Sequence, residues 1–148
     1  MSKKQLQEEL KQSMLAKDTL RTSVLRMVIS AIGYYEIQKG GAGYEATDED
    51  VMSVLQREVK QRRDSIEQYS AANRQDLADK EKQELELLGK YLPEQMGEEE
   101  IKTLVKEAVS QTGASTMQDI GKIMAALMPK VKGKADGAMV SKIVKETL

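Results

Sequence analysis

The chain has 148 residues with a formal net charge of −1, 40% hydrophobic and 32% charged residues, which suits one ordinary domain or two small ones with a well-solvated surface. It contains no Cys and no His, which excludes disulfides, thiolate nucleophiles, Cys-ligated metal centres and histidine acid–base catalysis. Because Trp and Phe are also absent, the core must be mainly aliphatic, with nine Met, and this favours packed helices over a β-sandwich.

The first 46 residues predict two helices and a loop. Apolar residues recur four apart in segment 6–14, which is helical spacing. Asp18 is placed to cap a second helix, whose broad apolar face runs from Leu20 to Tyr35. The glycine-rich segment 39–46 then breaks the pattern and predicts a loop.

Two further helices are predicted before residue 94. Thr47 precedes three acids, a pattern typical of a helix N-terminus, and an apolar stripe that also includes Arg62 follows over residues 51–69. A break at residues 71–73 separates it from a fourth helix, which begins near Gln75. We expect Leu92-Pro93 to stop that helix, because a residue before proline disfavours the helical conformation.

The C-terminal part predicts three short helices. The first follows Gly97 and ends at Gly113. The second is capped by Ser115 and ends at Met128-Pro129, and the third is capped by Asp136. No segment predicts a strand, so we expect an all-α fold.

The segment from Pro93 to Gly97 predicts a domain boundary. The expected organisation is an N-terminal helical domain of about four helices, residues 1–94, followed by a small three-helix C-terminal domain, residues 95–148.

A basic turn between the last two predicted helices is the main candidate site. It contains four lysines and no acid before Asp136: Lys122, Lys130, Lys132 and Lys134. Lysines in a turn can neutralise phosphates, and the start of the next helix offers backbone N–H groups to an anion. Gly133 and Gly137 allow close backbone approach to a ligand. The alternative is an ordinary solvated loop.

A second basic surface is a weaker candidate. It comprises Arg57, Lys60, Arg62 and Arg63. Helical geometry scatters these side chains around the axis, and nearby acids such as Asp64 can pair with them, so surface salt bridges are the competing interpretation.

Other clusters favour structural roles. Ser65 has no accompanying base, and Tyr69 continues the apolar stripe. The acids Glu98, Glu99 and Glu100 point in different directions on a helix and suit its dipole better than a metal ion. We therefore predict no catalytic residue, no metal site and no cofactor.

Several segments resemble the GatB/YqeY family over essentially the whole chain, and their combination carries the resemblance. They are Met14–Asp18, Arg21, Leu25–Met27, Val59–Tyr69, Asn73–Glu81, Tyr91–Met96 and Ile120–Val140.

The resemblance implies a two-part all-α fold whose small C-terminal domain is similar to the tail of the B subunit of tRNA-dependent amidotransferases. Those enzymes convert misacylated Glu-tRNA or Asp-tRNA to Gln-tRNA or Asn-tRNA with ammonia from glutamine, and the tail grips the tRNA body. The resemblance therefore implies that the basic turn binds tRNA. The domain that activates the acyl group with ATP has no counterpart in the 148 residues.

We therefore expect a non-catalytic tRNA-binding accessory protein that acts with an amidotransferase or another tRNA enzyme. Two alternatives stay open: an adaptor that docks on a protein through the tail domain, and a component of a carbon–nitrogen ligase that uses glutamine as amido donor. The charged N-terminus and the lack of an apolar run of ~18 residues predict a soluble cytoplasmic protein with no membrane partner.

Overall fold

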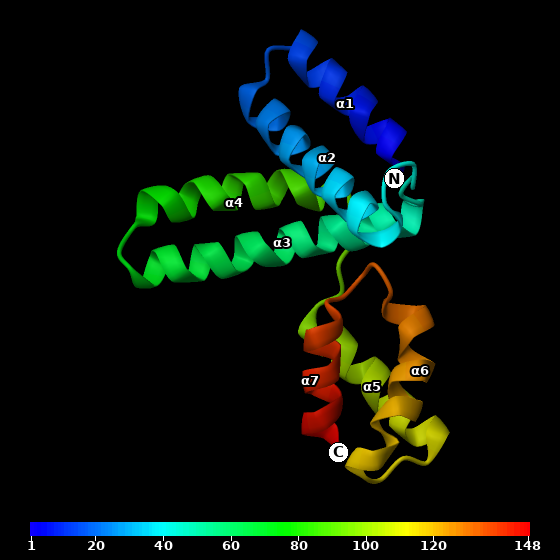
Figure 1. Cartoon of the computed structure of the whole chain (residues 1–148). Coiled ribbons are helices and arrows are strands. Elements are labelled where there is room, and N and C mark those ends of the chain that lie inside the picture. The colour runs from blue at the N-terminus through cyan, green and yellow to red at the C-terminus, as the bar shows by residue number, and fades with distance from the viewer. The chain divides into compact units, whose positions relative to one another are not determined.

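The chain folds into helices joined by turns and loops, and the all-α prediction is confirmed (Figure 1). The computed structural model describes every residue from Met1 to Leu148. The chain divides into two compact units, Met1–Leu92 and Pro93–Leu148. None of its helices combines the length and the apolar character that crossing a membrane requires.

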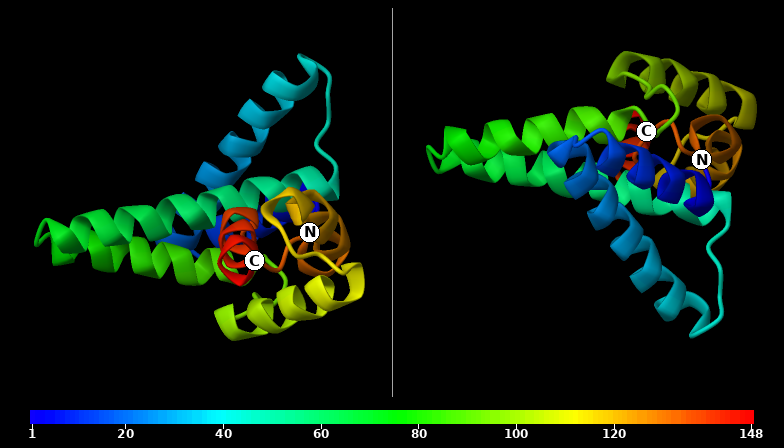
Figure 2. Two further views of the ribbon diagram at one scale, coloured as in Figure 1. Left: turned by 90° about the horizontal axis from the view of Figure 1, so that it is seen from below. Right: turned by 90° about the horizontal axis from the view of Figure 1, so that it is seen from above.

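The N-terminal unit consists of four helices around one aliphatic core. The helices are α1 (Lys3–Leu15), α2 (Thr19–Gly40), α3 (Asp48–Ala71) and α4 (Gln75–Gly89). Figure 2 shows α3 and α4 side by side as an antiparallel hairpin, while α1 packs along α2. The buried cluster contains only aliphatic side chains: Leu6, Val24, Leu25, Val28, Ile32, Val51, Val54, Leu55, Val59, Leu88 and Leu92.

Local capping explains where these helices begin. The carboxylate of Asp18 accepts the Arg21 amide at 3.1 Å, and the Thr47 hydroxyl accepts the Asp50 amide at 3.2 Å, so both predicted N-caps are confirmed. The end of α4 differs from the prediction, because it lies at Gly89 rather than at Leu92-Pro93. The amides of Lys90 and Tyr91 still bond to carbonyls three residues earlier, so the helix ends in turns before Pro93.

A buried carboxylate, Asp50, closes the loop between α2 and α3. It accepts hydrogen bonds from Lys39 Nζ at 2.7 Å, Tyr44 Oη at 2.6 Å and Tyr35 Oη at 3.0 Å. The Thr47 amide also donates to it, at 3.0 Å. These donors, above all the Lys39 ammonium and then the Tyr44 hydroxyl, hold the pKa of Asp50 far below its usual range.

A second carboxylate, Glu36, fixes the other side of the same loop. It is buried on α2 and accepts hydrogen bonds from Lys3 Nζ at 2.6 Å and from the Ala46 amide at 2.8 Å. These bonds lower the pKa of Glu36, the Lys3 bond contributing most. The start of α1 and the end of the loop are therefore both tied to α2.

A buried ionic group joins α3 to α4. Arg62 Nη1 donates to Glu58 Oε2 at 2.7 Å, and Arg62 Nε lies 3.2 Å from Glu84 Oε2. Arg62 belongs to the apolar stripe of α3, between Val59 and the α4 interface, and is 3% exposed. Because a buried charge is costly without its partner, loss of either carboxylate would strain the hairpin.

The C-terminal unit packs three helices around a separate aliphatic core. These are α5 (Glu98–Thr112), α6 (Ile120–Val131), which the short 3₁₀ helix η1 (Met117–Asp119) precedes, and α7 (Gly137–Thr147). The core residues are Ile101, Val105, Ala108, Ala114, Ile123, Leu127, Val131, Ala135, Val140, Ile143 and Val144. Gly113 ends α5 in the left-handed conformation, at φ 67°, as predicted.

Two predicted helix boundaries in this unit are wrong. Ser115 does not cap the second helix; its amide instead donates to Asp119 Oδ2 at 3.1 Å, and this bond is the main reason that the pKa of Asp119 is lowered. The helix also continues through Pro129 to Val131. A proline in the last turn removes a single helical hydrogen bond, and the carbonyl it leaves unpaired belongs to the exposed Ala125.

We predict that Asp50→Asn lowers the thermal midpoint at neutral pH, because it removes the ionised acceptor that closes the loop. The folded-state pKa of Asp50 is depressed, so its contribution is complete above the ordinary value of 3.8 and is lost as the pH falls below it. The difference in midpoint between wild type and variant should be constant above about pH 5 and shrink below about pH 4.

Thermal unfolding followed by circular dichroism measures this difference. Asp48→Asn, an exposed position in the same helical turn, makes the same change in net charge and serves as the control. No difference at neutral pH, or a difference that does not shrink in acid, would contradict the role assigned to Asp50.

Candidate nucleic-acid interface

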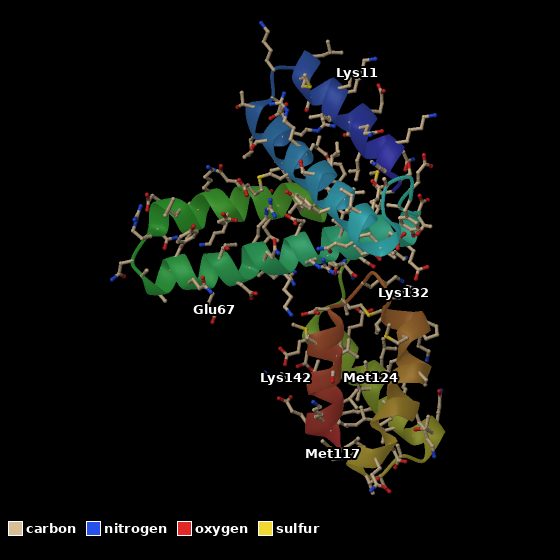
Figure 3. The ribbon with its side chains drawn as sticks, viewed as in Figure 1. Lys11, Glu67, Met117, Met124, Lys132 and Lys142 are labelled. Atoms are coloured by element: carbon tan, nitrogen blue, oxygen red, sulfur yellow. The ribbon has the colours of Figure 1, made fainter.

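The four lysines of the candidate site are all exposed, but they do not form one cluster. Lys130 lies in the last turn of α6, and Lys132 and Lys134 lie in the turn that leads to α7. Lys132 is labelled in Figure 3. Lys122 is eight residues earlier in α6, about 12 Å along the axis from Lys130. Its ammonium is 3.9 Å from Asp119, a weak contact for an exposed pair. We name residues Lys130–Lys134 the lysine turn.

The backbone of the lysine turn alternates between core and solvent. Val131, Gly133 and Ala135 are buried, whereas Lys132 and Lys134 are exposed. This alternation sends both lysine side chains outward. The burial pattern therefore explains why cations can occupy every second position next to an aliphatic core.

Gly133 makes the turn possible. Its φ is 77°, in the left-handed region that residues other than glycine rarely adopt. The amides of Lys134 and Ala135 then both donate to the carbonyl of Val131, at 2.9 and 3.0 Å. Backbone hydrogen bonds thus close the end of α6.

A second segment clamps the turn from outside. Gln95 Nε2 donates to the carbonyl of Gly133 at 2.9 Å and to that of Pro93 at 2.8 Å. The amide of Met96 donates to the carbonyl of Lys134 at 2.8 Å. The predicted boundary segment is therefore more than a linker, since it bonds to Gly133 and Lys134 of the lysine turn.

A backbone N–H group at the start of α7 is already bonded within the protein. Asp136 Oδ1 accepts the Ala138 amide at 3.2 Å, so the capping prediction is confirmed and this amide is not available to an anion. Gly137 has no left-handed backbone, and a Cβ there would meet no atom within 4 Å. The fold does not require glycine at this position, and the open space beside it leaves the backbone approachable.

The electrostatic balance of the turn favours an external anion. No carboxylate pairs with the ammonium groups of Lys130 or Lys134. Three lysines within five residues form a local positive field on a chain whose net charge is −1. Asp136, which follows the turn, caps α7 through its Oδ1.

The structure removes one residue, Arg62, from the predicted second basic surface. Arg57, Lys60 and Arg63 are exposed on α3, but Arg62 is buried between its two carboxylates and belongs to no surface. Arg62 can lie in the apolar stripe despite its charge, because Glu58 and Glu84 form ion pairs with the guanidinium inside the hairpin. Arg57 and Arg63 are six residues apart, about 120° around the helix, so they diverge.

Removing the clamp tests how the turn is held. We predict that Gln95→Ala lowers the free energy of unfolding by ~0.5–1.5 kcal/mol, the net value of a hydrogen bond. Amide hydrogen exchange should also speed up at Met96, whose N–H bonds to the same turn. Gln111→Ala, at an exposed position on α5, is the control and should change neither quantity. Unchanged protection of Met96 in Gln95→Ala would show that the side chain does not fix the turn.

Known proteins similar to this chain place it in a family. A family model described as Yqey-like protein matches residues 3–148. A relative in Pyrenophora tritici-repentis, named altered inheritance of mitochondria protein 41, mitochondrial, is 32% identical over 146 residues, covering 97% of this chain and 78% of the relative.

Two further relatives carry the same name. The protein from Vanderwaltozyma polyspora is 39% identical over 87 residues, 59% of this chain, and that from Candida glabrata is 33% identical over 114 residues, 72% of this chain. The matched regions span 46% and 59% of these two relatives, so the chain covers only about half of their length. The family match extends over nearly every residue of both units, and the chain belongs to the family of YqeY-like proteins.

Proposed function

We propose that the chain is a non-catalytic tRNA-binding accessory protein, working beside an amidotransferase or another tRNA enzyme. The observation that carries the proposal is the lysine turn, a backbone-clamped turn with three outward lysines. The resemblance to the amidotransferase tail supplies the choice of tRNA as the polyanion.

The geometry supports phosphate binding more than base reading. Lysine ammonium groups are point charges that neutralise phosphates and carry no sequence information by themselves. No aromatic side chain lies within the turn to stack on a base. We therefore expect recognition of the shape and charge of a folded RNA backbone, with little preference among sequences.

A backbone that is already ordered lowers the entropic cost of binding an anion through the three lysines. The hydrogen bonds from Gln95 and Met96 hold the turn before any ligand arrives, so binding orders only the lysine side chains. The proposal assigns no covalent step to the chain, which has neither Cys nor His to act as an activated nucleophile or base.

The proposal places the protein in the cytoplasm, where tRNA is available. Its relatives are named as mitochondrial proteins, and that compartment also contains tRNA. Binding through the lysine turn is therefore compatible with either location.

Salt dependence of tRNA affinity is the direct test. If Lys122, Lys130, Lys132 and Lys134 each neutralise one phosphate, log K should fall with log salt with a slope of about −3 to −4. Changing Lys130, Lys132 and Lys134 together to Ala should weaken binding and reduce the magnitude of the slope to about 1. Fluorescence anisotropy of labelled tRNA, titrated at four salt concentrations, measures both quantities.

The control variant removes the same charge from the same unit. It changes three exposed lysines outside the turn, Lys106, Lys142 and Lys145, to Ala. Equal weakening by both variants would mean that net charge, and not the lysine turn, determines binding. Absence of saturable tRNA binding by wild type at low salt would reject the proposal, and equal affinity for an unrelated RNA duplex would reject tRNA as the specific partner.

A further inference from the structure

The outer face of α2 carries an apolar stripe that the fold leaves uncovered. Met27, Tyr34 and Ile37 are 42%, 72% and 66% exposed, although α2 is among the best-packed helices of its unit on its other faces. The longer hairpin of α3 and α4 exposes no large hydrophobic side chain at all. Isolated exposed apolar residues are ordinary, but a concentration on one helix is not.

Helical spacing places these residues on one side of α2. Positions 23, 26, 27, 30, 34 and 37 fall within an arc of about 100°. The stripe along this arc, which we call the α2 face, comprises Ser23, Arg26, Met27, Ser30, Tyr34 and Ile37. Ser30 lies between Met27 and Tyr34, so a small side chain separates the large ones along the face.

Two adjoining depressions lie along this face. One, of about 590 Å³, is lined by residues of the α1–α2 junction and the start of α2, including Met14, Lys17 and Ser23. The other, of about 400 Å³, lies around Ser30 and Tyr34. Both have Arg26 and Met27 in their walls, so the hollows are continuous. A groove of this kind suits side chains projecting from a partner helix.

The charges that line the groove select the partner. Lys17 and Arg26 have no carboxylate partner. Lys17 lies near the α1–α2 junction, and Arg26 lies where the two hollows meet. The only acid in the walls is Glu58, which is bound to Arg62 Nη1 at 2.7 Å. The groove is thus apolar, with two cations in its walls and no free acid.

We propose that the α2 face binds an amphipathic helix of another protein, with aliphatic residues facing Met27, Tyr34 and Ile37 and carboxylates facing Lys17 and Arg26. A second copy of this chain is a poorer fit, because its own α2 face offers no acid to these two cations. RNA is also a poorer fit, because Met27 and Ile37 present apolar surface where a nucleic acid needs polar contacts. This surface lies in the N-terminal unit and is independent of tRNA binding through the lysine turn.

Photocrosslinking inside the cells that make the protein tests the occupant. A benzophenone amino acid replaces Ser30, which lines the second hollow, or replaces Ser110 of α5 as the control site. From Ser30 we expect a crosslink to a protein segment with apolar residues at helical spacing and at least two Asp or Glu. The double change Lys17→Glu and Arg26→Glu should abolish the product, while Lys142→Glu with Lys145→Glu should not.

Each other outcome overturns the proposal. A product that consists of two copies of the chain would identify a dimer interface, and a product sensitive to ribonuclease would identify RNA. No product from Ser30, or a crosslinked segment without carboxylates, would show that the α2 face is not a docking site of this kind. Circular dichroism of each variant confirms that it is folded.

Affinity of the crosslinked segment, made as a labelled peptide, then tests the apolar contacts with the purified full chain. Tyr34→Ala should weaken binding about tenfold or more, as expected of an aromatic residue at the centre of an interface. Met117→Ala, an exposed methionine of the other unit, should leave affinity unchanged. Equal affinities for wild type and Tyr34→Ala would reject the proposed contact.

Discussion

The hydrogen bonds from the Gln95–Met96 segment to the carbonyls of Gly133 and Lys134 are the contacts on which the functional account depends. They hold the lysine turn through its backbone alone. The ammonium groups of Lys130 and Lys134 have no carboxylate partner within the fold and stay in solvent. If lysine–carboxylate pairs closed the turn instead, its positive charge would be neutralised within the fold.

Buried charges have a different role in the N-terminal unit. Its core has no aromatic side chain in the fully buried set, and apolar packing alone would allow helices to slide. The Asp50 and Arg62 clusters each require particular donors and acceptors to meet, because an unpaired buried charge is costly. Asp50 thereby fixes the loop after α2, and Arg62 fixes the register of α3 against α4.

Local features were predicted well from the sequence, because each depends on a few neighbouring residues. Asp18, Thr47 and Asp136 cap helices through amides two or three positions away. The prediction that Ser115 caps a helix is wrong, because the 3₁₀ helix η1 begins after Thr116 and Asp119 accepts the amides of Ser115 and Thr116. The prediction that the helix ends at Met128-Pro129 is wrong, because a proline in the last turn removes only one helical hydrogen bond.

Contacts between residues far apart in the chain could not be predicted from local sequence patterns. Glu84 lies 22 positions from Arg62 in the chain, and only the hairpin brings the two together, so Arg62 was predicted on a surface that it does not reach. The alternation Val131, Gly133, Ala135 against Lys132, Lys134 is visible in the sequence and could have predicted which side chains point outward. The clamp by Gln95 carries no local signal.

Nuclear magnetic resonance of the isotope-labelled full chain, titrated with unlabelled tRNA, measures the central claim most directly. The account predicts that the earliest shifts and line broadening occur at the amides and lysine side chains of residues 130–137, while amides of the N-terminal unit stay at their free positions. Perturbations that begin in α3 or α4 and leave the lysine turn unchanged would contradict it.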